Sequence, residues 1–329
     1  MDGAARRPYP PRTMVRRSTV TVASALLLLP ALGCGSASDK STFDDSDGAA
    51  GQAQFAGGSG GASSGGSGGG FQSQGGGSGT EPPLCGEVGQ SIFVVSSPDS
   101  NLLRFDPKAL TFTKIGKLSC APGGLATPFS MAIRRDGNAY ILYDNGHIYR
   151  ASTTDASCSD SGYTPNQQGF SQFGMGYVSD GPGSSAETLF VMDNGAAGLA
   201  KIPDDGKLVK VAQFDGGLAG RSGEVTGTGE GRLFGFFVDI ADAKKTTVAE
   251  IDKTTGHVIS NVAQNLPAIS AWAFAHWGGS FYLFNGGGTG NSRVDKFTPG
   301  KGTAQVVANA GYRIVGAGVS TCAPTTEPE

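Results

Sequence analysis

Five segments of the chain share one pattern, in which an apolar residue is followed by an aromatic residue at the start of a strand-like run. The aromatic residues recur about every 44 to 50 positions, a period typical of a unit of four short strands. The five pairs are Ile92-Phe93, Ala139-Tyr140, Leu189-Phe190, Leu233-Phe234 and Phe281-Tyr282. We interpret them as the second strands of five structural repeats.

A second pattern keeps step with the first and predicts the third strand of each repeat. An apolar residue is followed two positions later by a charged one and then by a turn former, which is typical of a half-buried strand leading into a hairpin. The five copies begin at Leu102, Ile148, Leu199, Val248 and Val294. Alternating segments at 208–211, 257–260 and 304–307 predict outer fourth strands. No such run occurs in 151–169, so we expect the second repeat to lack its outer strand.

Short segments rich in Gly and Ala precede four of the pairs and predict innermost strands, because a crowded axis leaves little room for large side chains. They cover residues 130–133, 173–176, 224–227 and 272–275. The first repeat has no such segment, whereas residues 314–320 have this composition and no pair after them. The pattern therefore predicts an all-β, five-bladed β-propeller in which the C-terminal strand completes blade one and leaves no sheet edge open.

The cysteines of the repeat region are compatible with this closure. Cys85 precedes the first repeat and Cys322 follows the last strand, so a disulfide between them would fasten the ring. Cys120 and Cys158 end the first two repeats, which are neighbours in a propeller. Three pairings and a set of free thiols all remain open, because sequence alone does not choose among them. No Cys-x-x-Cys pair is present, so we expect no structural metal site.

The N-terminal part of the chain predicts export and a tether. Basic Arg16 and Arg17 precede an apolar stretch at 20–29 that is too short to cross a bilayer, which indicates a signal peptide over residues 1–33. Residues 34–83 are so rich in Gly and Ser that they cannot bury enough apolar surface to fold, and we predict a disordered linker there. The propeller would then occupy residues 84–323, followed by a disordered tail at 324–329. Translation from Met14 instead of Met1 is an open alternative.

Composition and motifs argue against most kinds of chemistry. The net charge of −3 gives no basic field for nucleic acid, so we expect no nucleic-acid partner. The sequence has no Gly-x-Ser-x-Gly elbow, His-Glu-x-x-His motif or phosphate loop. His147 and His257 follow glycines beside strands, and His276 with Trp277 is placed at the first turn of the fifth repeat. We therefore expect no catalytic residues, no cofactor and no metal.

Polar loops with Asn or Asp before Gly recur at one place in the repeats, between the second and third strands. They are residues 144–146, 193–195 and 285–286. The favoured interpretation is a hairpin turn that needs a positive φ. The alternative is a ligand surface, because equivalent loops gathered on one face of a propeller can hold a sugar.

The candidate ligand-binding residues are those expected at the mouth of the axis. Glu224 is the only carboxylate in the predicted inner strands, and an unpaired carboxylate there would be costly unless it is solvated or paired. We predict ligand contacts from Glu224 and Trp272, with Gln172 and Arg313 behind them. Arg313 is the suggested ion-pair partner of Glu224. For Trp272, a place in the core between blades is the competing interpretation.

Three functions are compatible with these features. We favour a monomeric, tethered, non-catalytic module that binds a glycan, a peptide or a protein. A hydrolase of the five-bladed glycosidase kind would need two or three carboxylates facing the central cavity, and the predicted inner strands supply one. A purely structural envelope protein would lack a recessed pocket with exposed aromatic side chains.

The N-terminus also resembles a known class of bacterial proteins. Ala31-Leu32-Gly33-Cys34 resembles the lipobox of bacterial lipoproteins. Together with the Gly/Ser linker and the blade pattern, it makes the whole chain similar to predicted secreted bacterial lipoproteins with a propeller domain, a group without an assigned activity. The resemblance implies acylation of Cys34 and a membrane partner through that lipid. Gly35 after the cysteine implies export to the outer membrane of the cell envelope. The competing interpretation is a secreted protein, cleaved near Gly33.

Overall fold

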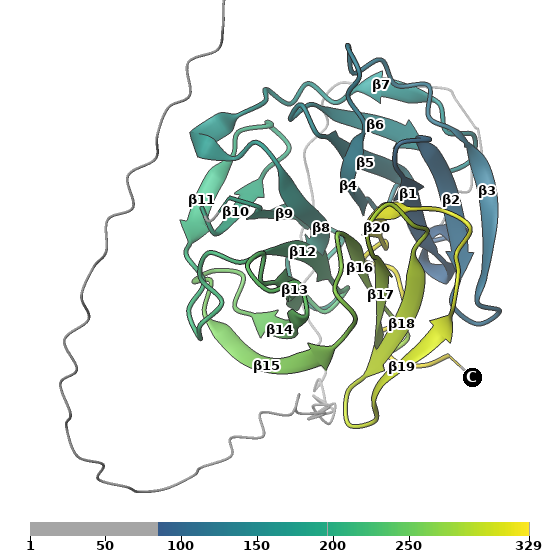
Figure 1. The fold of residues 1–329 in the computed structure, drawn as a ribbon. Coiled ribbons are helices and arrows are strands. Elements are labelled where there is room, and N and C mark those ends of the chain that lie inside the picture. Colours follow the sequence, from purple (N-terminus) through teal and green to yellow (C-terminus); the bar gives the residue numbers. More distant parts are fainter. Residues whose placement is uncertain (1–84, 196, 329) are drawn as a thin grey trace, which may run out of the picture. The chain divides into compact units, whose positions relative to one another are not determined.

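The structure is a computed structural model, and it describes residues 85–195 and 197–328. These residues form five antiparallel sheets of four strands each, arranged around a common axis (Figure 1). The predicted five-bladed β-propeller is therefore confirmed. The predicted signal peptide, the tether and Cys34 lie outside the described residues. Within the described ranges, no helix is long and apolar enough to cross a membrane.

Each blade runs from an inner strand at the axis to an outer strand at the rim. The inner strands, from blade one to blade five, are β20 (Ile314–Gly318), β4 (Pro128–Ile133), β8 (Phe173–Ser179), β12 (Ser222–Gly227) and β16 (Ala271–Trp277). The second strands are β1 (Ile92–Ser96), β5 (Asn138–Tyr143), β9 (Glu187–Asp193), β13 (Leu233–Val238) and β17 (Ser280–Gly286).

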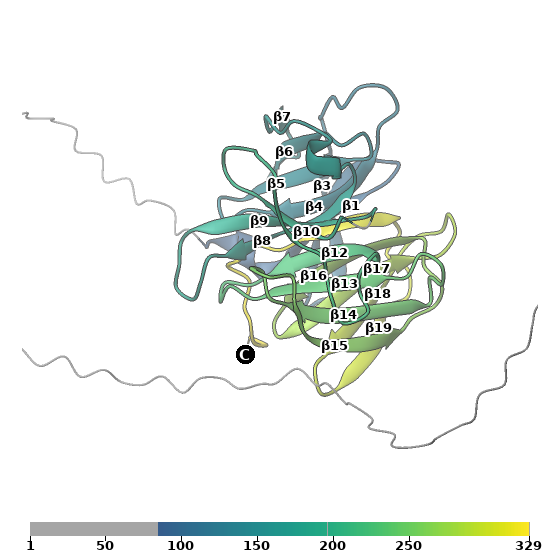
Figure 2. The ribbon, with the colours of Figure 1, turned by 90° about the vertical axis from the view of Figure 1, so that its left-hand side faces the viewer.

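The third strands are β2 (Asn101–Asp106), β6 (Ile148–Ser152), β10 (Leu199–Ile202), β14 (Lys245–Ile251) and β18 (Arg293–Thr298). The outer strands are β3 (Thr111–Lys117), β7 (Cys158–Asp160), β11 (Val209–Ala212), β15 (Val258–Asn265) and β19 (Gly302–Val307). Two short 3₁₀ helices, η1 (Glu87–Gln90) and η2 (Gln167–Gly169), complete the elements. Figure 2 shows the strands of blade four following one another from β12 to β15.

The apolar-aromatic pairs fill the layers between neighbouring blades. Successive residues of a strand face opposite sides of its sheet, so Leu233 packs in the layer toward blade three and Phe234 in the layer toward blade five. Phe281 and Tyr282 likewise belong to the two layers on either side of blade five. The core is divided in this way into five clusters, one between each pair of neighbouring blades. A second strand buried on both faces therefore needs two consecutive apolar residues.

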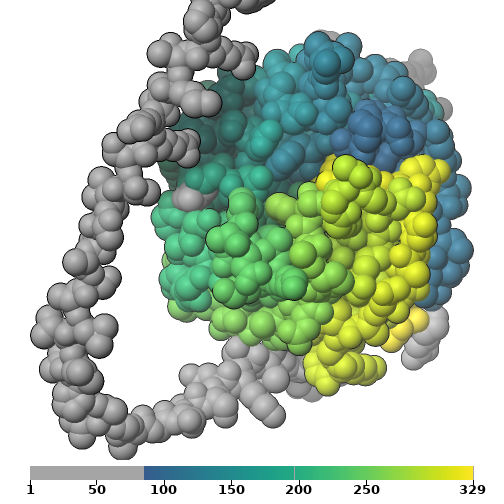
Figure 3. Space-filling view, in the orientation of Figure 1, coloured from purple at the N-terminus to yellow at the C-terminus, as the bar shows by residue number. Residues whose placement is uncertain are grey.

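Both ends of the repeat region build blade one, as predicted. β20 pairs antiparallel with β1, and the yellow, C-terminal part of the chain borders the blue part that forms blade one (Figure 3). The Cys85–Cys322 disulfide spans 237 residues, with a Cα–Cα distance of 5.2 Å, and fastens this closure. The Cys120–Cys158 disulfide joins the end of blade one to the outer strand of blade two. The structure thus selects one of the three pairings that the sequence left open.

Blade two has the outer strand that the sequence analysis did not expect. β7 covers only three residues, all half-buried or exposed, and pairs with β6. It is held by the disulfide at Cys158 and by the Cys158 N–H, which donates to Ser119 Oγ at 3.0 Å. The prediction was wrong because a strand fastened by cross-links needs no alternating apolar face.

His276 and Trp277 are also placed differently from the prediction. Both belong to the end of β16, and the turn is formed by Gly278 and Gly279. The φ values of these glycines are 61° and 69°, in the left-handed region that glycine adopts without strain. The two glycines therefore allow the strand to continue through His276 and Trp277 before the chain reverses.

Residues 324–328, expected to belong to a disordered tail, lie against blades four and five. The Gly278 N–H donates to Pro324 O at 2.7 Å, and Thr325 Oγ1 donates to Glu230 Oε1 at 2.7 Å. Glu327 adds an ion pair with Lys296 at 3.7 Å. These contacts are polar and distant in sequence, so the composition of the segment did not indicate them.

The inner strands approach one another so closely that a Cβ at several of their glycines would collide with backbone atoms, as two positions illustrate. A Cβ on Gly174 of β8 would lie 2.3 Å from Gly223 O and 2.5 Å from the Cα of Glu224. A Cβ on Gly316 of β20 would lie 2.8 Å from the backbone nitrogen of Met131. The missing side chain at position 174 brings the backbone of Glu224 directly against β8.

Candidate functional site

One residue precedes each inner strand, and these five residues surround one end of the axis. We call this end the front mouth, and the end where the inner strands finish the back mouth. The five residues are Thr127, Gln172, Arg221, Ser270 and Arg313. A backbone hydrogen bond recurs among them: Thr127 O accepts from Asp144 N at 3.0 Å, and Gln172 O accepts from Asn194 N at 2.9 Å. Two predicted site residues, Gln172 and Arg313, thus occupy equivalent positions.

A pocket of about 220 Å³ opens at the front mouth and includes three of the four predicted site residues, Glu224, Trp272 and Arg313. We call it the axial pocket. Its other lining residues are Ser97, Thr127, Pro128, Phe129, Asp144, Ser270, Ala271 and Val315. Apolar and aromatic walls with a few polar groups are typical of ligand sites, although such sites usually measure about 300–1,000 Å³. The size therefore suits a small group, such as one sugar ring.

Glu224 is the most deeply buried charged residue of the axial pocket. Only 2% of the residue is exposed. Its Oε2 accepts hydrogen bonds from Ser130 Oγ at 2.8 Å and from the Met175 N–H at 3.2 Å. Its Oε1 has no hydrogen-bond partner among the described residues. Burial raises the pKa of the Glu224 carboxyl well above its usual range, and the two hydrogen bonds oppose this only in part. The pocket therefore favours a neutral carboxylic acid.

Arg313 does not pair with Glu224, so the suggested ion pair is wrong. Its Nη1 donates to Gly288 O at 2.6 Å and its Nη2 donates to Ser270 O at 3.1 Å. The loop after β17 brings Gly288 within reach of the guanidinium, which is how two carbonyl oxygens replace the expected carboxylate. Across residues 85–195 and 197–328, no carboxylate forms an ion pair with Arg313. Its positive charge is thus fixed at the pocket wall without a counter-ion.

Two aromatic side chains on different blades contribute to the pocket. Trp272 is half-buried and packs against the cluster between blades four and five while it also lines the pocket. It therefore combines the two roles that the sequence analysis treated as alternatives. Phe129 of β4, which the sequence analysis did not single out, is half-buried in the same way beside the cluster between blades two and three.

Gln172 does not line the axial pocket, but it forms a hydrogen bond with Asp144, which does. Gln172 Nε2 donates to the backbone oxygen of Asp144 at 2.9 Å. The carboxylate of Asp144 accepts from the Thr127 N–H at 3.2 Å and from Thr127 Oγ1 at 3.0 Å. Gln172 is therefore a positioning residue for Asp144, which supplies the second carboxylate of the pocket.

The other two Asn- and Asp-containing loops stabilise their own turns or strands. Asp193 Oδ2 accepts from the Gly195 N–H at 3.0 Å and from the Ala197 N–H at 2.7 Å, as in an Asx turn. Asn285 is buried in β17 and donates to Asp295 Oδ2 at 2.7 Å. Of the three predicted loops, 144–146 is the one that contributes to the axial pocket.

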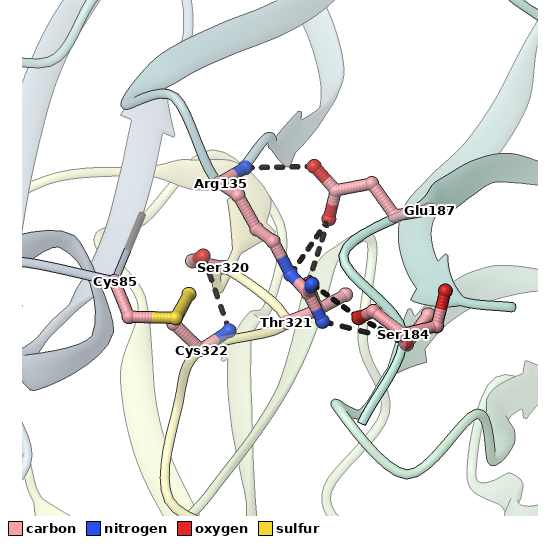
Figure 4. The surroundings of a disulfide bond; sticks show 8 residues. Cys85, Arg135, Ser184, Glu187, Ser320, Thr321 and Cys322 are labelled. Atoms are coloured by element: carbon pink, nitrogen blue, oxygen red, sulfur yellow. Dashed lines mark hydrogen bonds and ion pairs between the residues drawn. A yellow bond between two sulfur atoms is a disulfide. The ribbon is translucent and has the colours of Figure 1, made fainter. Parts of the chain in front are cut away.

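The back mouth carries a hydrogen-bond network that the sequence analysis missed. The Arg135 N–H donates to Glu187 Oε1 at 2.8 Å, Arg135 Nε donates to Thr321 Oγ1 at 2.5 Å, and Thr321 Oγ1 donates to Glu187 Oε2 at 2.7 Å (Figure 4). We call these three residues the closure network, because they tie blades two and three to the C-terminal segment beside Cys322. Burial raises the pKa of Glu187, and its hydrogen bonds to Arg135 and Thr321 oppose the shift. No local pattern marks these residues in the sequence.

The histidines take no part in the axial pocket. His147 and His257 are exposed, and His257 Nδ1 lies 2.5 Å from Asp215 Oδ2. His276 is buried beside Phe234 and Phe281, and burial lowers its pKa to about 4. In the part of the chain that the structure describes, no three His, Cys, Asp or Glu side chains are grouped so that they could hold a metal ion.

A larger groove of about 1010 Å³ lies beside blades one and two and includes Arg104, Lys114 and Arg135. Its charged side chains are exposed apart from Arg135, which is already bonded within the closure network. The axial pocket is smaller, but it holds a buried carboxyl group and an arginine without a counter-ion. We therefore place the candidate site at the front mouth.

The chain matches no protein-family model and no curated protein. Among solved structures, it is similar to a Bacteroides caccae protein of unknown function, at 11% identity and a TM-score of 0.42, over 70% of this chain and 98% of that one. It is also similar to Kuenenia stuttgartiensis hydrazine synthase, at 13% identity and a TM-score of 0.37, over 67% of this chain and 64% of that one. A third similar structure is a Bacteroides thetaiotaomicron protein of unknown function, at 14% identity and a TM-score of 0.41, over 59% of this chain and 53% of that one. Similarity this low carries no argument about activity, ligand or partners.

Proposed function

We propose that this protein is a non-catalytic recognition module that binds one unit of a glycan in the axial pocket. The observation that carries the proposal is Glu224. It is 2% exposed and lines an open pocket, yet only one of its carboxyl oxygens has hydrogen-bond partners among the described residues. Because no group of the described residues bonds to Oε1, this oxygen is available to a hydroxyl group of a ligand that enters the pocket.

The surroundings of Glu224 support a sugar as the ligand. The half-buried rings of Trp272 and Phe129 offer apolar surface to the carbon face of a sugar ring. Asp144 and Arg313 offer an acceptor and donors to hydroxyl groups at the rim. A recessed pocket with an accessible tryptophan also favours recognition over a purely structural role.

The proposal is tested by binding of the full-length protein to an array of envelope and extracellular glycans, followed by calorimetry. Truncation of a residue at the centre of a binding site commonly costs about 2 kcal/mol or more, so Trp272→Ala and Glu224→Ala should each weaken binding at least about 30-fold. Phe112→Ala is the matched control, because Phe112 is a half-buried aromatic residue outside the pocket. Absence of glycan binding, or an equal loss in the control, would contradict the proposal.

A glycoside hydrolase is the second candidate, because the pocket contains a second carboxylate, Asp144. Hydrolysis requires one carboxylic acid as proton donor and one carboxylate as base or nucleophile. The two roles match a neutral Glu224 and a hydrogen-bonded Asp144. Glu224→Gln separates the candidates, since the amide preserves hydrogen bonding but cannot donate a proton to a leaving group. If the wild type releases reducing sugar and this variant does not, the protein is a glycoside hydrolase and the proposal of a non-catalytic binding module is wrong.

We further propose that Cys34 carries a lipid that holds the propeller at the cell envelope. Support comes from the basic residues Arg16 and Arg17, the short apolar stretch at 20–29 and the Ala31-Leu32-Gly33-Cys34 motif. Two or more acyl chains give stable anchoring, because each buried methylene contributes about 0.8 kcal/mol. Metabolic labelling with a fatty-acid probe should mark the wild type and leave Cys34→Ser unlabelled. Equal labelling of both proteins would exclude this anchor.

A further inference from the structure

Resting on the proposed function, we infer that the axial pocket selects an acidic sugar, whose carboxylate pairs with the guanidinium of Arg313. The ligand class is a pyranose that carries one carboxylate, as in a uronic acid. The neutral sugar of the same ring and linkage would bind in the same pocket more weakly.

The first support is the way in which Arg313 is held. Gly288 O and Ser270 O fix its Nη1 and Nη2 at 2.6 and 3.1 Å, and Ser270 Oγ lies 3.4 Å from Nη2. A guanidinium has five N–H donors, and Nε of Arg313 donates to no residue that the structure describes. Donors therefore remain for a ligand, while the orientation of the group is already set. A preorganised arginine of this kind suits a planar carboxylate.

The second support is the balance of charge inside the pocket. Arg313 has only neutral acceptors, whereas the carboxylate of Asp144 already accepts two hydrogen bonds from Thr127. A ligand hydroxyl can donate to Asp144 without a change of charge. A ligand carboxylate supplies the counter-ion that Arg313 lacks.

The third support is the state of Glu224. The groups packed against its carboxyl, Ser130 of β4 and the backbone of Met175 in β8, are uncharged. Asp144 and Arg313 are the other ionisable residues that line the pocket. Because burial disfavours the charged form of Glu224, an acidic ligand meets no second buried negative charge at this end of the axis. The neutral acid can donate to a ring or hydroxyl oxygen.

The experiment compares acidic and neutral oligosaccharides of matched length and linkage on the full-length protein. The pairs are oligomers of glucuronic acid against glucose and of galacturonic acid against galactose, measured by calorimetry at low and high salt. We expect the acidic member of at least one pair to bind about tenfold or more tightly, because a charge-assisted bidentate contact is added. The difference should shrink as salt screens the exposed guanidinium.

Two arginines of the same ring provide the matched variants. Arg313→Gln should abolish the preference for the acidic sugar, so that the acidic and neutral sugars bind with equal affinity. Arg221→Gln should retain the preference, because Arg221 precedes the inner strand of blade four and does not line the pocket. Arg313→Lys should keep part of it, since the charge remains without the planar fork. Thermal unfolding of each variant verifies that the propeller is intact.

The outcomes separate this inference from the proposed function. Equal affinity for acidic and neutral sugars, or an equal loss of preference in Arg221→Gln, would overturn the acidic-sugar inference and leave a glycan-binding module. Failure of both acidic and neutral glycans to bind would overturn the proposed function itself.

Discussion

The two mouths of the propeller axis each contain a buried glutamate and an arginine, but they use them differently. At the back mouth, Arg135 and Glu187 are joined directly and through Thr321. At the front mouth, Arg313 is bonded to backbone carbonyls and Glu224 to a serine and a backbone N–H. The same two residue types therefore form a completed network at one end and an incomplete set of partners at the other.

The difference follows from where the chain closes. The C-terminal segment passes the back mouth beside the Cys85–Cys322 disulfide, and the closure network links it to blades two and three. Nothing comparable crosses the front mouth among the described residues. A group whose hydrogen bonds are complete contributes to stability, whereas one that lacks a partner in an open pocket is available to a ligand. This difference supports a structural role for the back mouth and the proposed recognition role for the front mouth.

The largest effect should come from opening the disulfide at the back mouth. In the chain-entropy description, the Cys85–Cys322 link stabilises the fold by about 5 kcal/mol and the shorter Cys120–Cys158 link by about 4 kcal/mol. We expect the double variant Cys85→Ser with Cys322→Ser to lose more unfolding free energy than Cys120→Ser with Cys158→Ser. Urea unfolding under oxidising conditions measures both. A larger loss from the Cys120–Cys158 pair would show that ring closure does not depend on the back mouth.

A smaller loss is expected from the closure network. Glu187→Ala leaves the partly buried guanidinium of Arg135 without its carboxylate, and removal of one partner from a buried pair costs about 3 kcal/mol. Glycan binding at the front mouth should remain within twofold of the wild type. The readouts are urea unfolding and calorimetry of the same preparation. A variant that keeps full stability but loses binding would reverse the roles assigned to the two mouths.

The smallest effect concerns pH and Glu224. Since burial raises its pKa in the folded state, the native protein holds this proton more tightly than the unfolded chain does. The resulting stability is complete below the unfolded pKa of about 4.3 and is lost as pH rises toward the folded value. Glu224→Gln removes this term, so the unfolding free energy of the variant relative to the wild type should increase between about pH 5 and pH 8, measured by urea unfolding at each pH.

Glu87→Gln serves as the control for this titration, because Glu87 is exposed. The change with pH in the unfolding free energy of Glu224→Gln is compared with that of this control. If the difference in unfolding free energy between Glu224→Gln and the wild type does not change with pH, Glu224 is ionised in the folded protein over this range. The charge balance proposed for the front mouth would then be wrong.

The repeat and its closure could be predicted from the sequence because they depend on local periodicity. The pairs such as Leu233-Phe234 mark strands buried on both faces, and the Gly-rich segment at 314–320 identifies the strand that completes blade one. The positions of Cys85 and Cys322 were compatible with the closure, although their pairing was not determined. The three-residue strand β7 has no alternation of apolar and polar residues, and the prediction that blade two lacks an outer strand was therefore wrong.

The sequence by itself thus determined the number of blades, the strand faces and the residues near the mouth of the axis, including Glu224 and Trp272. Only the tertiary structure decided which polar groups meet. Ser130 and Glu224 are 94 residues apart, and Arg135 and Thr321 are 186 residues apart. Periodicity fixes which side of a strand a residue occupies, but such contacts depend on how all five blades are turned around the axis. That is why Arg313 and Glu224 remain unpaired while Asp144 and Phe129 join the pocket.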